Sequence, residues 1–134
     1  MVTSREPFVS TAIAHADELS QQATDLLAAG DAPGAAQVFR EAITADPGHI
    51  EAHHGLIRAL GDASQFEAAI TAAVALTVLT PQDPLAHTSL SIALQQAGRI
   101  PEAENAAARA RILEWKQQLA MEPGEETQRG RPLP

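Results

Sequence analysis

The sequence contains no cysteine and no tyrosine, and its 134 residues include only three phenylalanines and one tryptophan. The absence of cysteine excludes disulfide bonds, thiolate metal ligands and a cysteine nucleophile. The scarcity of aromatic residues disfavours a β-sheet protein, because strands are enriched in aromatic and β-branched residues. The chain is nevertheless 45% hydrophobic, and its commonest residue is alanine, which has the highest helix propensity. The composition therefore predicts an all-α protein.

Positive charge is also scarce, because 9 basic residues face 17 acidic ones and the formal net charge is −8. Such a surface repels a phosphate backbone, and no basic stripe suggests an anionic lipid surface, so we expect no nucleic-acid and no membrane partner. The most apolar run, Ala68–Leu79, is shorter than the roughly 20 residues of a membrane-spanning helix. The first residues lack the basic start and apolar stretch of a signal peptide. We therefore expect a cytoplasmic protein.

The chain repeats itself at an interval of 34 positions, the distance from Pro47 to Pro81. His53 falls on His87 at the same shift. At three positions the same residue type recurs in all three units, which we call a column: Leu26, Leu60 and Leu94, then Ala35, Ala69 and Ala103, then Ala29, Ala63 and Ala97. Coincidence of several columns at one period indicates a tandem array of small structural units.

Each unit has the pattern of two helices. Residues 50–63 place apolar side chains at helical spacing, and Pro81 ends the apolar stretch 66–79, because proline cannot continue a helix. The stretch 66–79 is apolar almost all round, so we expect it to be covered on most sides. The predicted helices are near residues 11–29, 33–45, 50–62, 66–79, 84–97 and 101–120. The predicted core is Leu26, Phe39, Leu56, Leu60, Ile70, Leu76, Leu90 and Leu94.

The period and its motif resemble the tetratricopeptide repeat, whose pattern is W-x2-L-G-x2-Y, then A-x3-F, then Pro. The first unit, residues 16–49, carries Ala35, Phe39 and Pro47 at the matching positions. The second unit covers residues 50–83 and the third residues 84–120, with alanine at the Phe position. The resemblance implies a right-handed α-α superhelix (solenoid) of three stacked antiparallel helix pairs. We expect this repeat domain over residues 11–121, an irregular segment at 1–10, and a disordered tail at 122–134, which is rich in Pro, Gly and charge.

The histidines are the only residues that suggest a metal or catalytic site. His49, His53 and His54 are close in sequence. Their stretch reads H-I-E-A-H rather than the H-E-x-x-H of zinc proteases, and His49 precedes the predicted helix. We favour packing or surface histidines over a metal site. With no nucleophile motif and no phosphate-binding loop, we expect no enzyme activity, no catalytic residue, no metal and no cofactor.

The resemblance implies a protein–protein interaction scaffold or adaptor that binds a peptide or partner subunit in the concave groove of the solenoid. The implied groove residues are Glu51, His54, Arg58, Thr88, Ile92 and Gln95, preceded in the first unit by Asp17, Ser20, Thr24 and Leu27. For each of them, simple solvation is the alternative explanation. Members of the family that bind a C-terminal carboxylate use Lys and Asn at these positions. This chain has neither there, which disfavours that class of partner.

The last predicted helix carries an apolar stripe of Ile112, Trp115 and Leu119, spaced by three and four residues. A repeat array exposes at its end the face on which a next unit would stack, and the tail contains no helix that could cover it. Either the stripe folds back over the third unit, or it docks against a second copy or a partner subunit. The second possibility makes the chain a structural subunit that self-associates through its C-terminal helix, as a homodimer.

Overall fold

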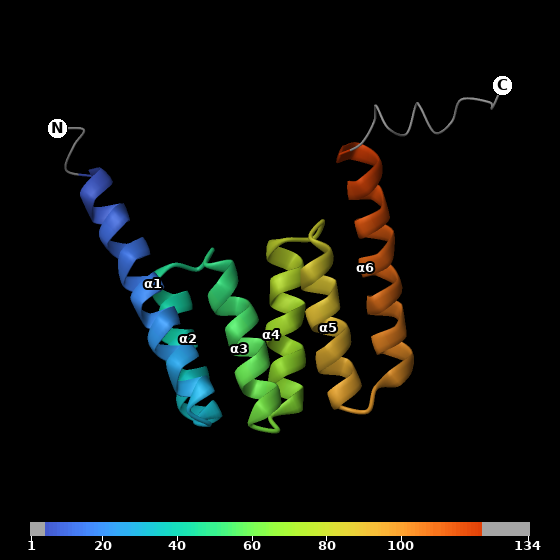
Figure 1. The fold of residues 1–134 in the computed structure, drawn as a ribbon, viewed down its shortest axis with the longest axis horizontal. Helices are drawn as coiled ribbons and strands as arrows, with labels where there is room; N and C mark the ends of the chain where they lie inside the picture. The colour runs from blue at the N-terminus through green and yellow to red at the C-terminus, as the bar shows by residue number, and fades with distance from the viewer. Residues whose placement is uncertain (1–4, 122–134) are drawn as a thin grey trace.

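The computed structural model describes residues 5–121, which form six helices and contain no strand. The helices are α1 (Arg5–Ala28), α2 (Ala32–Ala45), α3 (Ile50–Asp62), α4 (Phe66–Leu79), α5 (Pro84–Gln96) and α6 (Ile100–Met121). Successive helices run in opposite directions (Figure 1). The all-α prediction is confirmed. None of the helices in this part of the chain combines the length and hydropathy needed to span a bilayer.

The helix boundaries agree closely with the predicted ones except at the N-terminal end. There α1 begins at Arg5, so the prediction of an irregular segment up to residue 10 is wrong for residues 5–10. Pro7 lies in the first turn of α1, where its missing N–H leaves no helical hydrogen bond unmade. The predicted disordered tail at 122–134 lies outside the described residues.

Three helices end in the same hydrogen-bonded turn, one in each unit. The residues after α1, α3 and α5 have positive φ at Gly30 (91°), Ser64 (61°) and Gly98 (79°). Each turn closes with a backbone bond that reaches back five residues, for example from Gln65 N to Leu60 O at 2.8 Å. This pattern is the Schellman motif, which satisfies carbonyls at the end of a helix. The 34-residue period thus places the same turn in all three units.

Replacing Ser64 by glycine is expected to raise the free energy of unfolding by roughly 0.5–1 kcal/mol, because a side chain at positive φ is strained whereas glycine is not. Ser64 is exposed and has positive φ, so the substitution removes no packing. Urea unfolding followed by circular dichroism measures the change. A loss of stability would show that the serine conformation is not strained.

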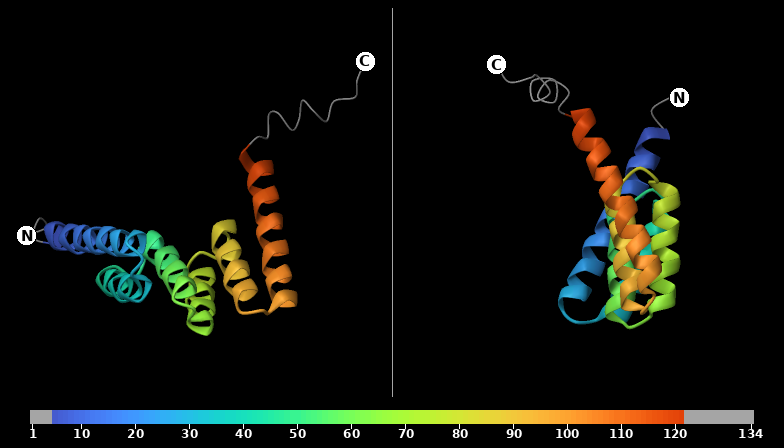
Figure 2. Two further views of the ribbon diagram at one scale, coloured as in Figure 1. Left: turned by 60° about the horizontal axis from the view of Figure 1, so that its bottom comes forward. Right: turned by 90° about the vertical axis from the view of Figure 1, so that its right-hand side faces the viewer.

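The helix pairs stack into a curved right-handed solenoid with α1, α3 and α5 on its inner side (Figure 2). Each helix packs on the next one along the chain. In addition, α1 contacts α3, and α3 contacts α5. By contrast, α2, α4 and α6 do not contact one another within residues 5–121. The odd-numbered helices are therefore closer together than the even-numbered ones, and their shared face is the concave one.

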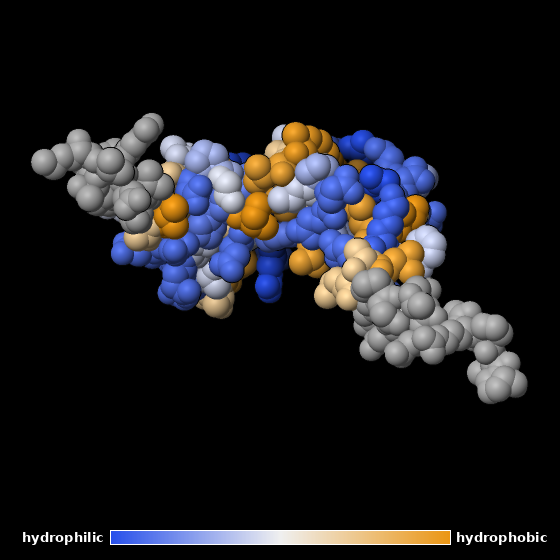
Figure 3. Space-filling view, turned by 90° about the horizontal axis from the view of Figure 1, so that it is seen from above, coloured by the Kyte–Doolittle hydropathy of each residue, from blue (hydrophilic) through white to orange (hydrophobic). Residues whose placement is uncertain are grey.

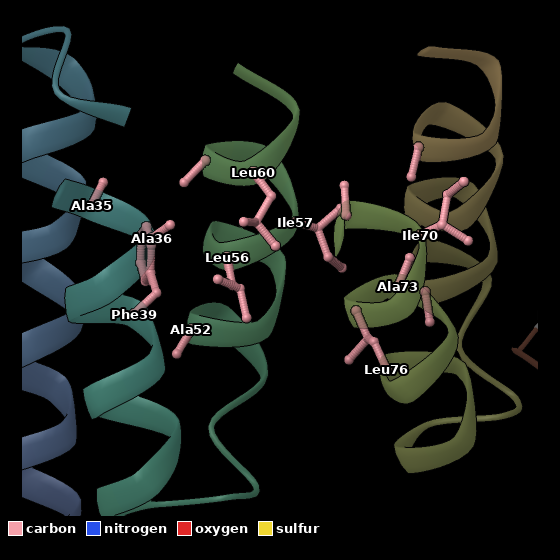
Figure 4. Close-up of a cluster of buried hydrophobic side chains, with 14 of the residues drawn as sticks. Ala35, Ala36, Phe39, Ala52, Leu56, Ile57, Leu60, Ile70, Ala73 and Leu76 are labelled. Carbon is pink, nitrogen blue, oxygen red and sulfur yellow. The ribbon is translucent and has the colours of Figure 1, made fainter. Parts of the chain in front are cut away.

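The core runs continuously between the helices from α1 to α6, and Figure 4 shows its central part around α2, α3 and α4. Six of the predicted core residues are buried, namely Phe39, Leu56, Leu60, Ile70, Leu76 and Leu94. Leu26 and Leu90 are only partly buried against this cluster. Much of the remaining core is alanine, which allows close approach of the helices. Because closely packed helices leave little space to fill, the few aromatic residues of this chain suffice to complete the core.

The outer face of α4 differs from the prediction that this helix is covered on most sides. Its buried residues, among them Ala69 and Ala73, contact the neighbouring helices. On the opposite face Val74 and Val78 are exposed, Val78 by 75% of its area. The prediction is wrong because α4 lies on the convex side of a single layer of helix pairs, where no second layer covers it.

Candidate binding groove

A hollow of about 400 Å³ opens on the inner face between α3 and α5. Its lining residues are His54, Ile57, Arg58, Asp62, Ser89, Ile92 and Gln96. On α3 the lining residues recur at intervals of three and four, which places them on one face of the helix. The hollow therefore combines apolar surface from two isoleucines with charged and hydrogen-bonding groups.

A smaller hollow of about 120 Å³ lies between α1 and α3. It is lined by Thr24, Leu27, Ala28 and Arg58. Arg58 thus lines both hollows, which makes them neighbouring parts of one surface along α1, α3 and α5. We call this surface the inner groove.

Arg58 is the cation at the centre of the inner groove. Its side chain is exposed, and it forms no ion pair or side-chain hydrogen bond within residues 5–121. By contrast, Arg99 in the α5–α6 turn is bound to Glu102 at 2.7 Å and to Glu67 of α4 at 3.4 Å. The five N–H donors of Arg58 are therefore available to a carboxylate or to carbonyl groups of a bound chain.

His54 connects α3 to α5 across the floor of the groove. Its Nδ1 lies 2.9 Å from Ser89 Oγ, and its Nε2 is buried without a hydrogen-bond partner in the described part of the chain. Burial lowers the pKa of His54 below its usual 6.5, Asp83 opposes this shift, and neighbouring His53 adds to it. A partly buried ring whose Nε2 is buried without a partner disfavours the charged form, so the ring is neutral at pH 7.

The lowered pKa of His54 predicts a pH-dependent stability. Between pH 6.5 and the lower folded-state pKa, the unfolded chain binds more protons at this position than the folded chain. The free energy of unfolding therefore falls as the pH is lowered through this interval. Urea unfolding at several pH values should show a steeper acid loss in the wild type than in His54→Gln, which cannot titrate. Parallel pH profiles of stability for the two proteins would contradict a lowered pKa of His54.

The structure brings together three of the six residues predicted for the groove. His54, Arg58 and Ile92 line the larger hollow. Residues Glu51, Thr88 and Gln95 do not line it. Four lining residues, Ile57, Asp62, Ser89 and Gln96, were missed. Ser89 and Gln96 lie three residues before and four after Ile92, and Asp62 lies four after Arg58, so these three share a helix face with a predicted residue.

In the first unit the predicted residues divide into two groups. Thr24 and Leu27 line the smaller hollow. Ser20 is buried, and Asp17 accepts a hydrogen bond from His49 Nε2 at 2.6 Å. The ring of His49 also accepts the backbone N–H of Ala52 through Nδ1 at 3.1 Å, which caps α3. Asp17 therefore joins α1 to the start of α3.

His53 and His87 also have structural contacts. Nε2 of His53 lies 2.8 Å from the carbonyl oxygen of Pro47, and Nε2 of His87 lies 2.9 Å from that of Pro81. A carbonyl only accepts, so each ring donates its N–H. The same pair thus closes the turn before α3 and before α5, which explains why His and Pro recur together at the 34-residue period. No group of potential metal ligands occurs within residues 5–121.

The predicted C-terminal stripe is uncovered. Trp115 is 61% exposed, and Ile112 and Leu119 are also exposed. Figure 3 shows hydrophobic surface at this end of the molecule. Among the described residues, therefore, the alternative that the stripe folds back over the third unit does not occur. Leu113, next to Ile112 in the sequence, is instead the large side chain of α6 that is buried.

Residues 26–91 match the family model described as tetratricopeptide repeat. No protein with a curated description matches the sequence. Solved structures of similar fold include the type III secretion translocator chaperone SycD of Yersinia enterocolitica, in an alternative dimer. It has 22% identity and a TM-score of 0.68, over 85% of this chain and 84% of that one.

A second structure of SycD, in complex with a peptide of the translocator YopD, has a TM-score of 0.66 and 22% identity over 78% of this chain and 84% of that one. The second repeat domain of Spaghetti (RPAP3), bound to the HSP90 peptide SRMEEVD, has a TM-score of 0.67 and 16% identity. That match covers 74% of this chain and 92% of the other. At these identities the similarity establishes the fold.

Proposed function

Because the chain belongs to the tetratricopeptide-repeat family, we propose that it is a protein–protein interaction scaffold that binds a peptide or partner subunit in the inner groove. The observation that carries this proposal is the unpaired Arg58 beside an apolar floor of Ile57 and Ile92. Such a combination of a few directed polar groups with apolar surface is typical of binding sites. The structures of SycD with a YopD peptide and of the RPAP3 domain with an HSP90 peptide support it by analogy of fold.

The lining residues indicate the chemistry of the bound segment. An apolar side chain of the partner would pack between Ile57 and Ile92, and a carboxylate or a pair of carbonyls would accept hydrogen bonds from Arg58. Ser89 and Gln96 offer further hydrogen bonds at the rim. No lysine lines either hollow, so we do not propose a partner recognised by its C-terminal carboxylate. We propose no catalytic role for this surface.

The experiment uses peptides selected from a random phage-displayed library against the full chain. Arg58→Ala combined with Ile92→Asp should weaken binding of the selected peptides by at least about tenfold, since it removes a central anchor and places a charge in the hollow. Both residues are exposed, so the melting temperature should change little. Fluorescence anisotropy measures the affinity.

The control variant is Arg40→Ala with Val78→Asp, which makes the same kinds of change outside the inner groove. Arg40 and Val78 are exposed on α2 and α4. This variant should bind as the wild type does. Equal binding by the groove variant would show that the inner groove is not the binding site.

A second candidate function is that of a structural subunit that self-associates through α6. The observation that favours it is the exposed stripe of Ile112, Trp115 and Leu119. A tryptophan exposed over 61% of its area is a typical anchor of protein interfaces.

A further inference from the structure

The end of α6 protrudes beyond the helix on which it packs. The buried residues of α6 are Ala103, Ala106, Ala110 and Leu113, and every residue from Glu114 to Met121 is exposed. Figure 1 shows this end of α6 rising past α5. At 1.5 Å per residue these eight residues form about 12 Å of helix without a neighbour. We call residues 109–121, which include the exposed stripe, the α6 end.

The α6 end has the opposite charge to the rest of the molecule. Residues 109–121 contain three basic residues, Arg109, Arg111 and Lys116, against Glu114, so the formal charge is +2. Residues 5–108 contain four basic and thirteen acidic residues, so their formal charge is −9. A basic, apolar helix end is thus attached to an acidic body. The charge of the body also opposes an anionic lipid surface as the partner of this end.

Stacking of a further repeat unit does not explain the stripe. By the 34-residue period Ile112 corresponds to Val78 of α4, which is 75% exposed although the third unit stacks on α4. The core residue Ile70 of α4 corresponds instead to Glu104, which is exposed. The face of α6 that would receive a next unit is therefore polar there, so α6 itself caps the array. Our expectation that the stripe marks the stacking face is wrong.

Pairing of two α6 ends with each other is also disfavoured by charge. Such a contact would bring Arg111 and Lys116 of two copies together at one small interface, and like charges in contact are repulsive. The stripe itself has only three large apolar residues, so little burial would offset that repulsion. A second copy offers a better surface elsewhere.

The inner groove of a second copy complements the α6 end. Glu51 and Asp62 lie on the same helix face of α3 as Arg58, because they are seven residues before and four after it. Asp62 lines the larger hollow together with Ile57 and Ile92. Besides the cation Arg58, the groove surface therefore carries two acidic side chains, Asp62 in the larger hollow and Glu51 outside it, that have no ion-pair partner within residues 5–121.

We propose that the α6 end of one copy docks in the inner groove of a second copy, with Trp115 as the anchor in the hollow between α3 and α5. Arg111 and Lys116 then approach Glu51 and Asp62 of the copy that provides the groove. This inference rests on the groove proposed above and names a second copy as its occupant. Because the two contacting surfaces differ, the contact either extends head to tail with concentration or is exchanged reciprocally between two copies in a symmetric dimer.

The test uses two variants of the full chain that each lack one of the two surfaces. The end variant is Ile112→Ser with Trp115→Ala, and the groove variant is Asp62→Lys with Ile92→Lys. All four residues are exposed, so both variants should fold. In sedimentation velocity the wild type should associate with rising concentration, less so at high salt because screening weakens the charge contacts. Each variant alone should remain monomeric.

Mixing the two variants should restore one wild-type contact, between the α6 end of the groove variant and the groove of the end variant. We expect a 1:1 complex and no larger species. Trp115 is the only tryptophan and is absent from the end variant. A blue shift of tryptophan emission on mixing therefore reports burial of this one side chain. Val78→Ser, on the outer face of α4, is the control and should associate as the wild type does.

Several results would overturn the proposal. Self-association of the groove variant alone would indicate pairing of two α6 ends, and a wild type that stays monomeric would show that the α6 end has no second copy as its partner. Emission shifts with anionic vesicles but not on mixing would assign the α6 end to a lipid surface. None of these results bears on selected peptides, whose loss of binding in Arg58→Ala with Ile92→Asp tests the groove separately.

Discussion

Replacing Leu60 by alanine is expected to lower the free energy of unfolding by roughly 2–5 kcal/mol. Leu60 is fully buried in the central unit and packs in the cluster that joins α2, α3 and α4. The substitution removes three buried carbon atoms and leaves a cavity, which rigid helices on both sides can fill only in part. In a single layer of stacked helix pairs each unit contacts only its neighbours, so loss of the central contacts weakens both interfaces.

Urea unfolding followed by circular dichroism measures this effect. The matched control is Leu85→Ala, because Leu85 is 61% exposed and its truncation should change stability by less than about 0.5 kcal/mol. Similar losses for the two variants would show that Leu60 does not lie in the core.

Replacing Gly55 by alanine is expected to lower the free energy of unfolding by roughly 1–3 kcal/mol, although alanine is normally the better residue in a helix. A Cβ at Gly55 would overlap the ring of Phe39. The Phe39 ring is itself buried between α2 and α3 and has little room to move (Figure 4). The first and second units therefore pack through an aromatic ring that lies directly on the backbone of α3.

Gly61 provides the control within the same helix. The atoms nearest to a Cβ at Gly61 would be those at the end of the Gln96 side chain, the first at 2.5 Å. Gln96 is exposed and can rotate away. Gly61→Ala should therefore leave stability unchanged or raise it by up to about 1 kcal/mol through helix propensity. Equal effects at Gly55 and Gly61 would contradict the packing described for Phe39.

The fold could be predicted because its signals are local and repeated. Gly30 and Gly98 have positive φ at the ends of helices, and Pro81 follows the end of α4. Because glycine and proline are typical of these positions, they indicate in the sequence where a helix ends. The start of α1 had no such signal. A proline in the first turn is compatible with a helix, and residues 5–10 show no apolar spacing from which a helix could be recognised.

Exposure was harder to predict than secondary structure. The residues of α4 are apolar on the outer face as well as the inner one, and nothing local distinguishes buried Ile70 from exposed Val78. The difference arises from the curvature of the solenoid, which places α4 on the convex side. Comparison of the units at the 34-residue shift predicts part of the exposure pattern, since the position of Ile70 is occupied by Glu104 in the last unit.

The candidate groove could be predicted to the level of helix faces but not of individual side chains. His54, Arg58 and Ile92 were placed correctly around the hollow, whereas Thr88 and Gln95 were chosen instead of their neighbours Ser89 and Gln96. Adjacent residues differ by about 100° around a helix axis, so the orientation of α5 about its own axis decides which of them lines the hollow. That orientation is set by packing against α3 and α6 and is not visible in the residue pattern.

The measurement that most directly tests the central claim, that the chain binds proteins through its inner groove, is a map of the bound surface. Amide resonances of the full chain would be followed by NMR while a selected peptide is added. We predict that the shifts cluster on α1, α3 and α5, with His54, Arg58 and Ile92 among the most affected residues. Shifts confined to the outer face of α2 and α4, around Val74 and Val78, would contradict the account.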